Sequence, residues 1–159
     1  MQPASTLYFA IFHSLSVEII SKIPKQDASD IHIPNASCLY TDYSAEYTFT
    51  PLTGANHMVN FRVQGAIRSY AFGLLPDGKA AILKNDNGYS VLTETAFDWK
   101  LGEEYMVKVT AKGNCLKAEI NGCVLEVCDH GRPYLTGSVG VSMRSGSHDK
   151  YRKIKVGGV

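Results

Sequence analysis

The sequence predicts an all-β domain, a sandwich or a barrel, built from short strands. About a dozen runs of alternating apolar and polar residues, rich in β-branched and aromatic side chains, follow one another at short intervals. The segments between them contain Gly, Pro, Asn and Asp, which favour tight turns. Few windows place apolar residues at i, i+3, i+4 and i+7 without an interruption, so we expect at most one or two helical turns. Strands at this spacing are typical of all-β folds.

The strands are expected in an order that runs through the whole chain. The first run is apolar, but it lacks the basic flank and the cleavage site of a signal peptide, so we interpret it as a strand. We expect the chain to be part of a larger protein, and the sequence does not indicate where that protein resides. The expected strands cover residues 7–12, 16–23, 38–50, 57–64, 69–75, 79–84, 89–94, 105–112, 115–121, 123–128, 137–144 and 151–156.

Two turns fix the register of their flanking strands. The two-residue turn Asn121-Gly122 is a strong hairpin signal and pairs Ile120 with Cys123. It also places Lys117 opposite Glu126 as a pair of opposite charges. One face of this hairpin is then predicted to be buried, and it consists of Leu116, Ala118, Ile120, Cys123, Leu125 and Val127.

The turn at Pro76-Asp77-Gly78 has a preset φ, a side-chain cap and a residue that tolerates positive φ. It pairs Tyr70 with Lys84, so these two side chains share one face of the sheet. Apolar residues lie on the same face, and the pattern leaves open whether that face is core or solvent.

Composition bounds the class of protein. The chain has 159 residues, enough for one domain with its own core, and we expect a single domain over residues 1–159. Sixteen Lys and Arg against fifteen Asp and Glu give a formal charge of +1, which argues against nucleic acid or an anionic membrane as a partner. Hydrophobic residues at 45% exclude a disordered chain. We expect the isolated domain to be monomeric.

The cysteines and histidines give little support for a metal. The four cysteines lack zinc-type spacing, and the five histidines are scattered. In the predicted hairpin Cys115 faces Cys128, which permits a disulfide, although two reduced thiols are the favoured interpretation. Asp129 and Asp149 stand at strand ends where a structural calcium is conceivable, but two solvated loop acids are favoured. We therefore expect no cofactor and no metal.

A series of residues in the second half of the chain resembles the closing half of concanavalin A-like jelly rolls. The spacings are those of "W-x-x-G-x-x-Y" followed by two Gly-centred strand motifs, and the resemblance extends over residues 38–157. The residues that carry it are Phe97, Trp99, Gly102, Tyr105, Gly113, Gly122, Asp129, Tyr134, Gly137 and Val141.

Within that superfamily the chain is similar to laminin G-like domains and to family 66 carbohydrate-binding modules. The segment from Tyr40 to Pro51 also resembles jelly rolls appended to bacterial ADP-ribosylglycohydrolase-like proteins. The resemblance implies a two-sheet antiparallel jelly-roll sandwich. It does not fix a function, because this fold hosts lectins, glucanases and adhesion modules alike.

The sequence offers no recognisable catalytic residues. Glucanases of this fold place carboxylates two and four residues apart on one strand, and no such array occurs in this chain. No Gly-x-Ser-x-Gly motif is present either. We therefore predict that the protein is not an enzyme.

A binding face is the remaining candidate site. Alternation along residues 59–64 places Asn60, Arg62 and Gln64 on one face, where two amides and a guanidinium suit the hydroxyls of a sugar. The alternative is that Arg62 pairs with a carboxylate for structural reasons, in which case the site lies in the loops around residues 85–89 and 129–134. The candidate ring platforms are Tyr40, Tyr43, Tyr70 and Tyr89, with Lys84 or Asn85 at the edge.

Three functions are compatible with these patterns. The favoured one is a non-catalytic carbohydrate-binding module for a polysaccharide or oligosaccharide, in a larger bacterial protein. The second is a laminin G-like module for protein interaction or adhesion. The third is a glycoside hydrolase whose catalytic residues the pattern does not reveal.

Overall fold

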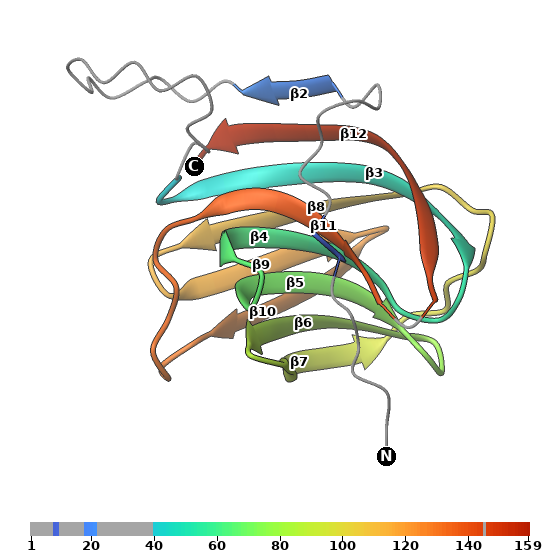
Figure 1. Cartoon of the computed structure of the whole chain (residues 1–159), viewed down its shortest axis with the longest axis horizontal. Coiled ribbons are helices and arrows are strands. Elements are labelled where there is room, and N and C mark those ends of the chain that lie inside the picture. The colour runs from blue at the N-terminus through green and yellow to red at the C-terminus, as the bar shows by residue number, and fades with distance from the viewer. Residues whose placement is uncertain (1–7, 10–17, 22–39, 145) are drawn as a thin grey trace.

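Two β-sheets pack face to face in the computed structural model, which describes residues 8–9, 18–21, 40–144 and 146–159 (Figure 1). No helix occurs in these ranges, and so none that could span a membrane. The predicted two-sheet sandwich is therefore confirmed. Of the first two expected strands, only Tyr8–Phe9 and Glu18–Ser21 are described, and the rest of both lies outside the described residues.

Sheet A has six strands. Two consecutive hairpins, β4–β5 and β5–β6, form its centre. Every pair of neighbouring strands in the sheet is antiparallel. In spatial order the strands are β1 (Tyr8–Phe9), β11 (Ser138–Met143), β4 (His57–Gly65), β5 (Arg68–Leu75), β6 (Lys79–Asp86) and β7 (Tyr89–Ala96).

Sheet B also has six strands. Its long central strands β3 and β12 run side by side across the sandwich (Figure 1). All neighbours are antiparallel except β2, which joins β12 in parallel at the edge of the sheet. In spatial order the strands are β10 (Cys123–Cys128), β9 (Cys115–Ile120), β8 (Tyr105–Lys112), β3 (Tyr43–Thr53), β12 (His148–Gly158) and β2 (Glu18–Ser21).

Both registers predicted from turns are confirmed. The turn at Asn121-Gly122 pairs Ile120 with Cys123, and the Nζ atom of Lys117 lies 3.6 Å from a carboxylate oxygen of Glu126. The predicted inner face of this hairpin packs into the core, with Cys123 and Val127 half-buried at its edge. The turn at residues 76–78 likewise pairs Tyr70 with Lys84.

The core lies between the two sheets and is filled by the inward side chains of both. Alternation along each strand supplies these residues, and the aromatic ones dominate by size. Trp99 lies at the core edge, where its Nε1 donates a hydrogen bond to the Leu75 carbonyl at 2.8 Å. The largest fully buried apolar side chains are Tyr43, Tyr47, Tyr70, Phe49, Phe61, Phe72, Met58, Leu74, Ile82, Leu116 and Ile120.

Candidate functional site

The outer face of sheet A, which points away from sheet B, carries a second cluster of buried side chains. Because Val59, Phe72 and Ile82 point into the core, their neighbours along each strand point outward. Met58, Ala71, Ala81 and Leu83 form an apolar floor on this face, and Leu75 and Tyr89 pack against it.

A polar group adjoins this floor and is centred on Tyr89. The Nδ2 atom of Asn60 donates hydrogen bonds to the Tyr89 hydroxyl at 3.0 Å and to the Ser69 hydroxyl at 3.2 Å. The Tyr89 hydroxyl also lies 3.4 Å from Ser142 Oγ. Residues of four strands, β4, β5, β7 and β11, therefore meet at one point on the outer face of the sheet.

The amide oxygen of Asn60 is an unused acceptor in this group. Asn60 is fully buried, and its Oδ1 atom has no hydrogen-bond partner among the residues that the structure describes. A buried acceptor without a partner costs about 1–3 kcal/mol. The atom itself is inaccessible to solvent, so a ligand hydroxyl reaches it only when the side chains around it move.

Arg144 covers the same tyrosine from the other side. Its guanidinium carbon lies 5.3 Å from the centroid of the Tyr89 ring, within the range of a cation–π contact. Both side chains belong to half-buried residues, so they are reached from the surface. Arg144 follows β11 directly, while Tyr89 opens β7, and only the fold brings them together.

Two of the predicted site residues lie at the rim of this region or in its loops, and a third, Tyr40, packs against the core between the sheets. Asn85 is buried, and its amide closes the β6–β7 turn by accepting from the Gly88 amide at 3.0 Å. Gln64 is exposed and donates to the Thr136 carbonyl at 3.0 Å. Tyr40 forms an isolated bridge with Gly137 and is half-buried.

Arg62 does not share the outer face with Asn60 and Gln64, and that prediction is wrong. The register between β4 and β5 shifts after Phe61, and Arg62 has a φ of 47°. This conformation interrupts the alternation and turns its side chain inward, where it is fully buried. Gly137, which directly precedes β11, makes the irregularity possible, because a Cβ there would overlap the Arg62 main chain.

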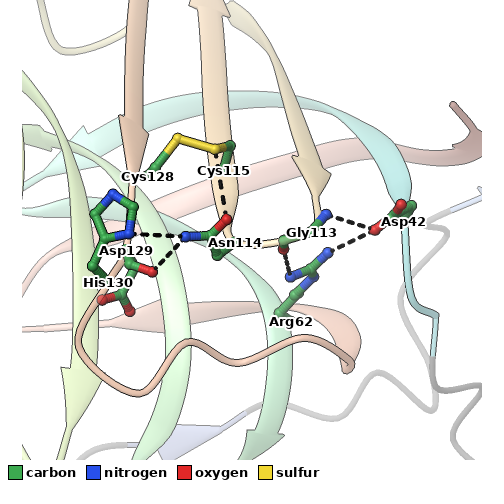
Figure 2. Close-up of a disulfide and its surroundings, with 8 residues drawn as sticks. All are labelled: Asp42, Arg62, Gly113, Asn114, Cys115, Cys128, Asp129 and His130. Carbon is green, nitrogen blue, oxygen red and sulfur yellow. Dashed lines mark hydrogen bonds and ion pairs between the residues drawn. A yellow bond between two sulfur atoms is a disulfide. The ribbon is translucent and has the colours of Figure 1, made fainter.

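The Arg62 guanidinium instead ties together segments at one end of the sandwich. Its Nη1 donates to the carbonyls of Gly113 at 2.5 Å and Tyr134 at 2.7 Å. Its Nη2 donates to the Thr41 carbonyl at 3.0 Å and lies 3.3 Å from Asp42 Oδ1 (Figure 2). The alternative interpretation of Arg62, a structural ion pair, is therefore the one that the geometry supports.

Tyr70 and Lys84 share a face, as predicted, and that face is core. Both contact the Asp129 carboxylate: the Tyr70 hydroxyl donates to Oδ2 at 2.7 Å and Lys84 Nζ at 2.6 Å. Lys84 also donates to the carbonyls of Gly131 and Arg132. The two side chains are thus placed to hold the sheets together, away from the outer face.

Tyr43 is likewise a core residue. Its hydroxyl accepts a hydrogen bond from the Arg62 amide at 2.7 Å and donates to the Ser138 carbonyl at 3.3 Å. Burial raises the pKa of Tyr43 and of Tyr70 well above the usual value for tyrosine, so both are neutral hydroxyls at ordinary pH.

A disulfide joins Cys115 to Cys128, which corrects the favoured interpretation of two free thiols. It lies on the exposed side of the β9–β10 hairpin (Figure 2). Beside it, Asn114 and Asp129 exchange hydrogen bonds, from the Asp129 amide to the Asn114 carbonyl and from Asn114 Nδ2 to the Asp129 carbonyl. The end of the hairpin is therefore fixed next to the buried Asp129 carboxylate.

The two aspartates considered for calcium are not solvated loop acids, so that favoured interpretation is wrong. Asp129 binds Tyr70 and Lys84, while the buried carboxylate of Asp149 contacts His57 Nδ1 at 2.6 Å and the Tyr151 hydroxyl at 3.1 Å. Within residues 40–144 and 146–159, no group of three or more His, Cys, Asp or Glu side chains is arranged to hold a metal ion.

The sequence pattern points to Asn60 and Tyr89 but not to Ser69, Ser142 and Arg144. The sequence does contain a signal for the two serines, because alternation along residues 69–75 and 137–144 places each of them on the face of its strand that points away from the core. Placing Ser142 beside Asn60 requires the pairing of β11 with β4, which joins segments far apart in the chain, whereas Ser69 reaches Asn60 through the local pairing of β4 with β5.

Known structures resemble the chain in fold. A family 66 carbohydrate-binding module from Bacillus subtilis superposes with a TM-score of 0.67 at 18% identity, covering 76% of this chain and 77% of that one. Chicken galectin 2 superposes with a TM-score of 0.61 at 12% identity, covering 76% and 94%. A Bacillus subtilis protein of unknown function with a galectin-like fold gives 0.59 at 15% identity, covering 76% and 74%.

These likenesses show a galectin-like and concanavalin A-like β-sandwich, in agreement with the resemblance seen in the sequence. No protein-family model matches the chain, and no curated protein matches it significantly in sequence. At identities this low the superpositions establish the fold alone.

Proposed function

We propose that the protein is a non-catalytic carbohydrate-binding module that holds a polysaccharide or oligosaccharide on the outer face of sheet A. The observation that carries the proposal is the polar group around Tyr89, with the unpartnered Oδ1 atom of Asn60 at its centre. An aromatic ring beside amide and hydroxyl groups offers both the apolar surface and the hydrogen bonds that a sugar needs.

The names of the similar structures support the same class of ligand. One is a carbohydrate-binding module, and another is a galectin. Neither name transfers a particular sugar to this chain. The proposed site therefore rests on the residues of this protein, with Asn60 and Tyr89 at the centre, Ser69 and Ser142 beside them, and Gln64 and Asn85 toward the rim.

Binding is expected to be weak, in the micromolar to millimolar range. The polar groups must replace the hydrogen bonds that sugar hydroxyls make with water, so each contributes only a small net free energy. No hydrolysis is expected, because no strand presents a pair of carboxylates at catalytic separation. Glu94 pairs with Lys79 at 2.8 Å, and Asp129 pairs with Lys84 inside the sandwich.

A glycan array followed by titration of the best hit tests the proposal. Tyr89→Ala and Asn60→Ala are expected to weaken binding about tenfold or more, the equivalent of losing one or two good contacts. Met106→Ala is the control, because Met106 is an exposed residue on the outer side of sheet B. An array without a single hit would overturn the proposal in favour of a protein-interaction module, as would hits that both variants retain in full.

A further inference from the structure

Arg144 carries a positive charge that the described part of the chain leaves unmatched. No carboxylate within residues 40–144 and 146–159 lies at ion-pair distance from it, and its guanidinium makes no hydrogen bond there. The contrast with two other arginines is clear. Arg62 donates to three carbonyls and contacts a carboxylate, and Arg152 grips Glu104 through two nitrogens at 2.8 and 2.9 Å.

Two carboxylates near Arg144 already have partners: one is on the strand of Tyr89, and the other follows Arg144 closely in the sequence. Glu94 on β7 pairs with Lys79, and Asp149 on β12 is buried against His57 and Tyr151. A guanidinium presents five N–H donors in a planar fork that matches the oxygens of a carboxylate or a sulfate. Its contact with the Tyr89 ring holds that fork beside the polar group around Tyr89.

We infer that the ligand of this face is an acidic glycan, whose carboxylate or sulfate group is bound by Arg144. The inference rests on the proposed function and names the class of sugar for the same site. Arg144 supplies donors for the acidic group, and the ring of the half-buried Tyr89 lies directly beside them. A neutral sugar leaves the Arg144 donors without a charged partner.

Matched pairs of ligands separate charge from shape. The probes are an oligogalacturonide against its methyl ester, and a sulfated galactan oligosaccharide against its desulfated form, each titrated calorimetrically into the full chain. At low salt, the acidic member of at least one pair is expected to bind about tenfold more tightly than its neutral partner, because a hydrogen bond to a charged group exceeds one to a neutral group. The preference is expected to shrink as salt rises from about 0.05 to about 0.5 M. The two pairs tell carboxylate from sulfate as the source of the charge.

Two variants assign the preference to Arg144. Arg144→Gln is expected to lower binding of the acidic probe to the level of the neutral one, and Arg144→Lys to keep part of the preference, since an ammonium keeps the charge without the fork. Arg152→Gln is the control, because it removes the same charge from an exposed position on sheet B. Far-UV spectra establish that each variant is folded.

The possible outcomes distinguish the preference for acidic glycans from carbohydrate binding as such. If acidic and neutral probes bind equally, or if Arg144→Gln keeps the preference, the inference is overturned and the carbohydrate-binding function stands. If neither these probes nor any glycan of the array binds, both fail together.

Discussion

Lys84 and Asp129 form a buried ion pair that connects the two sheets of the sandwich. Lys84 stands on β6 in sheet A, Asp129 directly follows β10 in sheet B, and Nζ lies 2.6 Å from Oδ2, with side chains only 9% and 5% exposed. The Lys84 ammonium also lies 4.9 Å from the centroid of the Tyr134 ring. The sugar site proposed for the outer face of sheet A depends on this ion pair, because the pair holds sheet A against sheet B.

Lys84→Met is expected to destabilise the fold by about 3–5 kcal/mol, because it leaves the Asp129 carboxylate buried without its cation. Urea unfolding followed by fluorescence measures the change in the free energy of unfolding. Lys79→Met is the matched control, since the Lys79–Glu94 pair is exposed and such pairs contribute less than about 1 kcal/mol. Equal losses in the two variants would contradict the interpretation of Lys84 as an anchor.

The stability of the protein is expected to fall in acid through Asp129. Burial acts to raise the pKa of this carboxyl, but hydrogen bonds from Lys84, Tyr70 and the Gly131 amide outweigh it and hold the pKa below the ordinary 3.8. A carboxyl with a lowered pKa in the folded state contributes stability above its unfolded pKa and loses it as pH falls toward the folded value.

Asp129→Asn tests this pH dependence. The difference in unfolding free energy between the original protein and the variant should be constant near neutral pH and shrink below about pH 4. Urea titrations at a series of pH values provide the measurement. A difference that stays constant down to the most acidic value would show that Asp129 is not the group responsible.

The features of the fold that the sequence predicts correctly are those set by local residue patterns. A short turn of defined length fixes the pairing of the residues in its hairpin, so the registers around Asn121-Gly122 and Pro76-Asp77-Gly78 follow from the residues alone. The all-β class follows from the number and spacing of strands, and the resemblance to concanavalin A-like jelly rolls indicates a sandwich and not a barrel.

The candidate site is harder to predict because its key geometry is non-local. Arg62 turns inward at a bulge that only the nearby Gly137 permits, so strict alternation predicts the wrong face for it. Arg144 reaches Tyr89 across the sheet from the end of β11 to β7. Neither contact can be predicted from the alternation of residues within a single strand.

The disulfide between Cys115 and Cys128 is expected to stabilise the fold by about 2–3 kcal/mol, because it closes a loop with a sequence separation of 13 in the unfolded chain. The double variant Cys115→Ala, Cys128→Ala should lose this amount in urea unfolding, and a dithiol reductant should have the same effect on the original protein. Cys123→Ala is the control, as Cys123 is half-buried and unbonded. A double variant as stable as the control would contradict the expectation.

Arg62 provides a prediction that separates folding from binding. Arg62→Ala leaves the buried Tyr134 carbonyl without its donor, and the carbonyls of Gly113 and Thr41 lose theirs, so we expect a loss of about 2–4 kcal/mol in unfolding free energy. Arg62→Lys should lose less, because one ammonium replaces part of the fork.

Below its unfolding temperature, Arg62→Ala should still bind the glycan that the original protein binds, since the guanidinium lies between the sheets and not on the outer face. Tyr89→Ala is expected to bind weakly even at temperatures where it is fully folded, because it removes the ring of the proposed site. If Arg62→Ala keeps its stability and loses the glycan, the ligand sits at the end of the sandwich, near Asp42 and Gly113, and not over Tyr89.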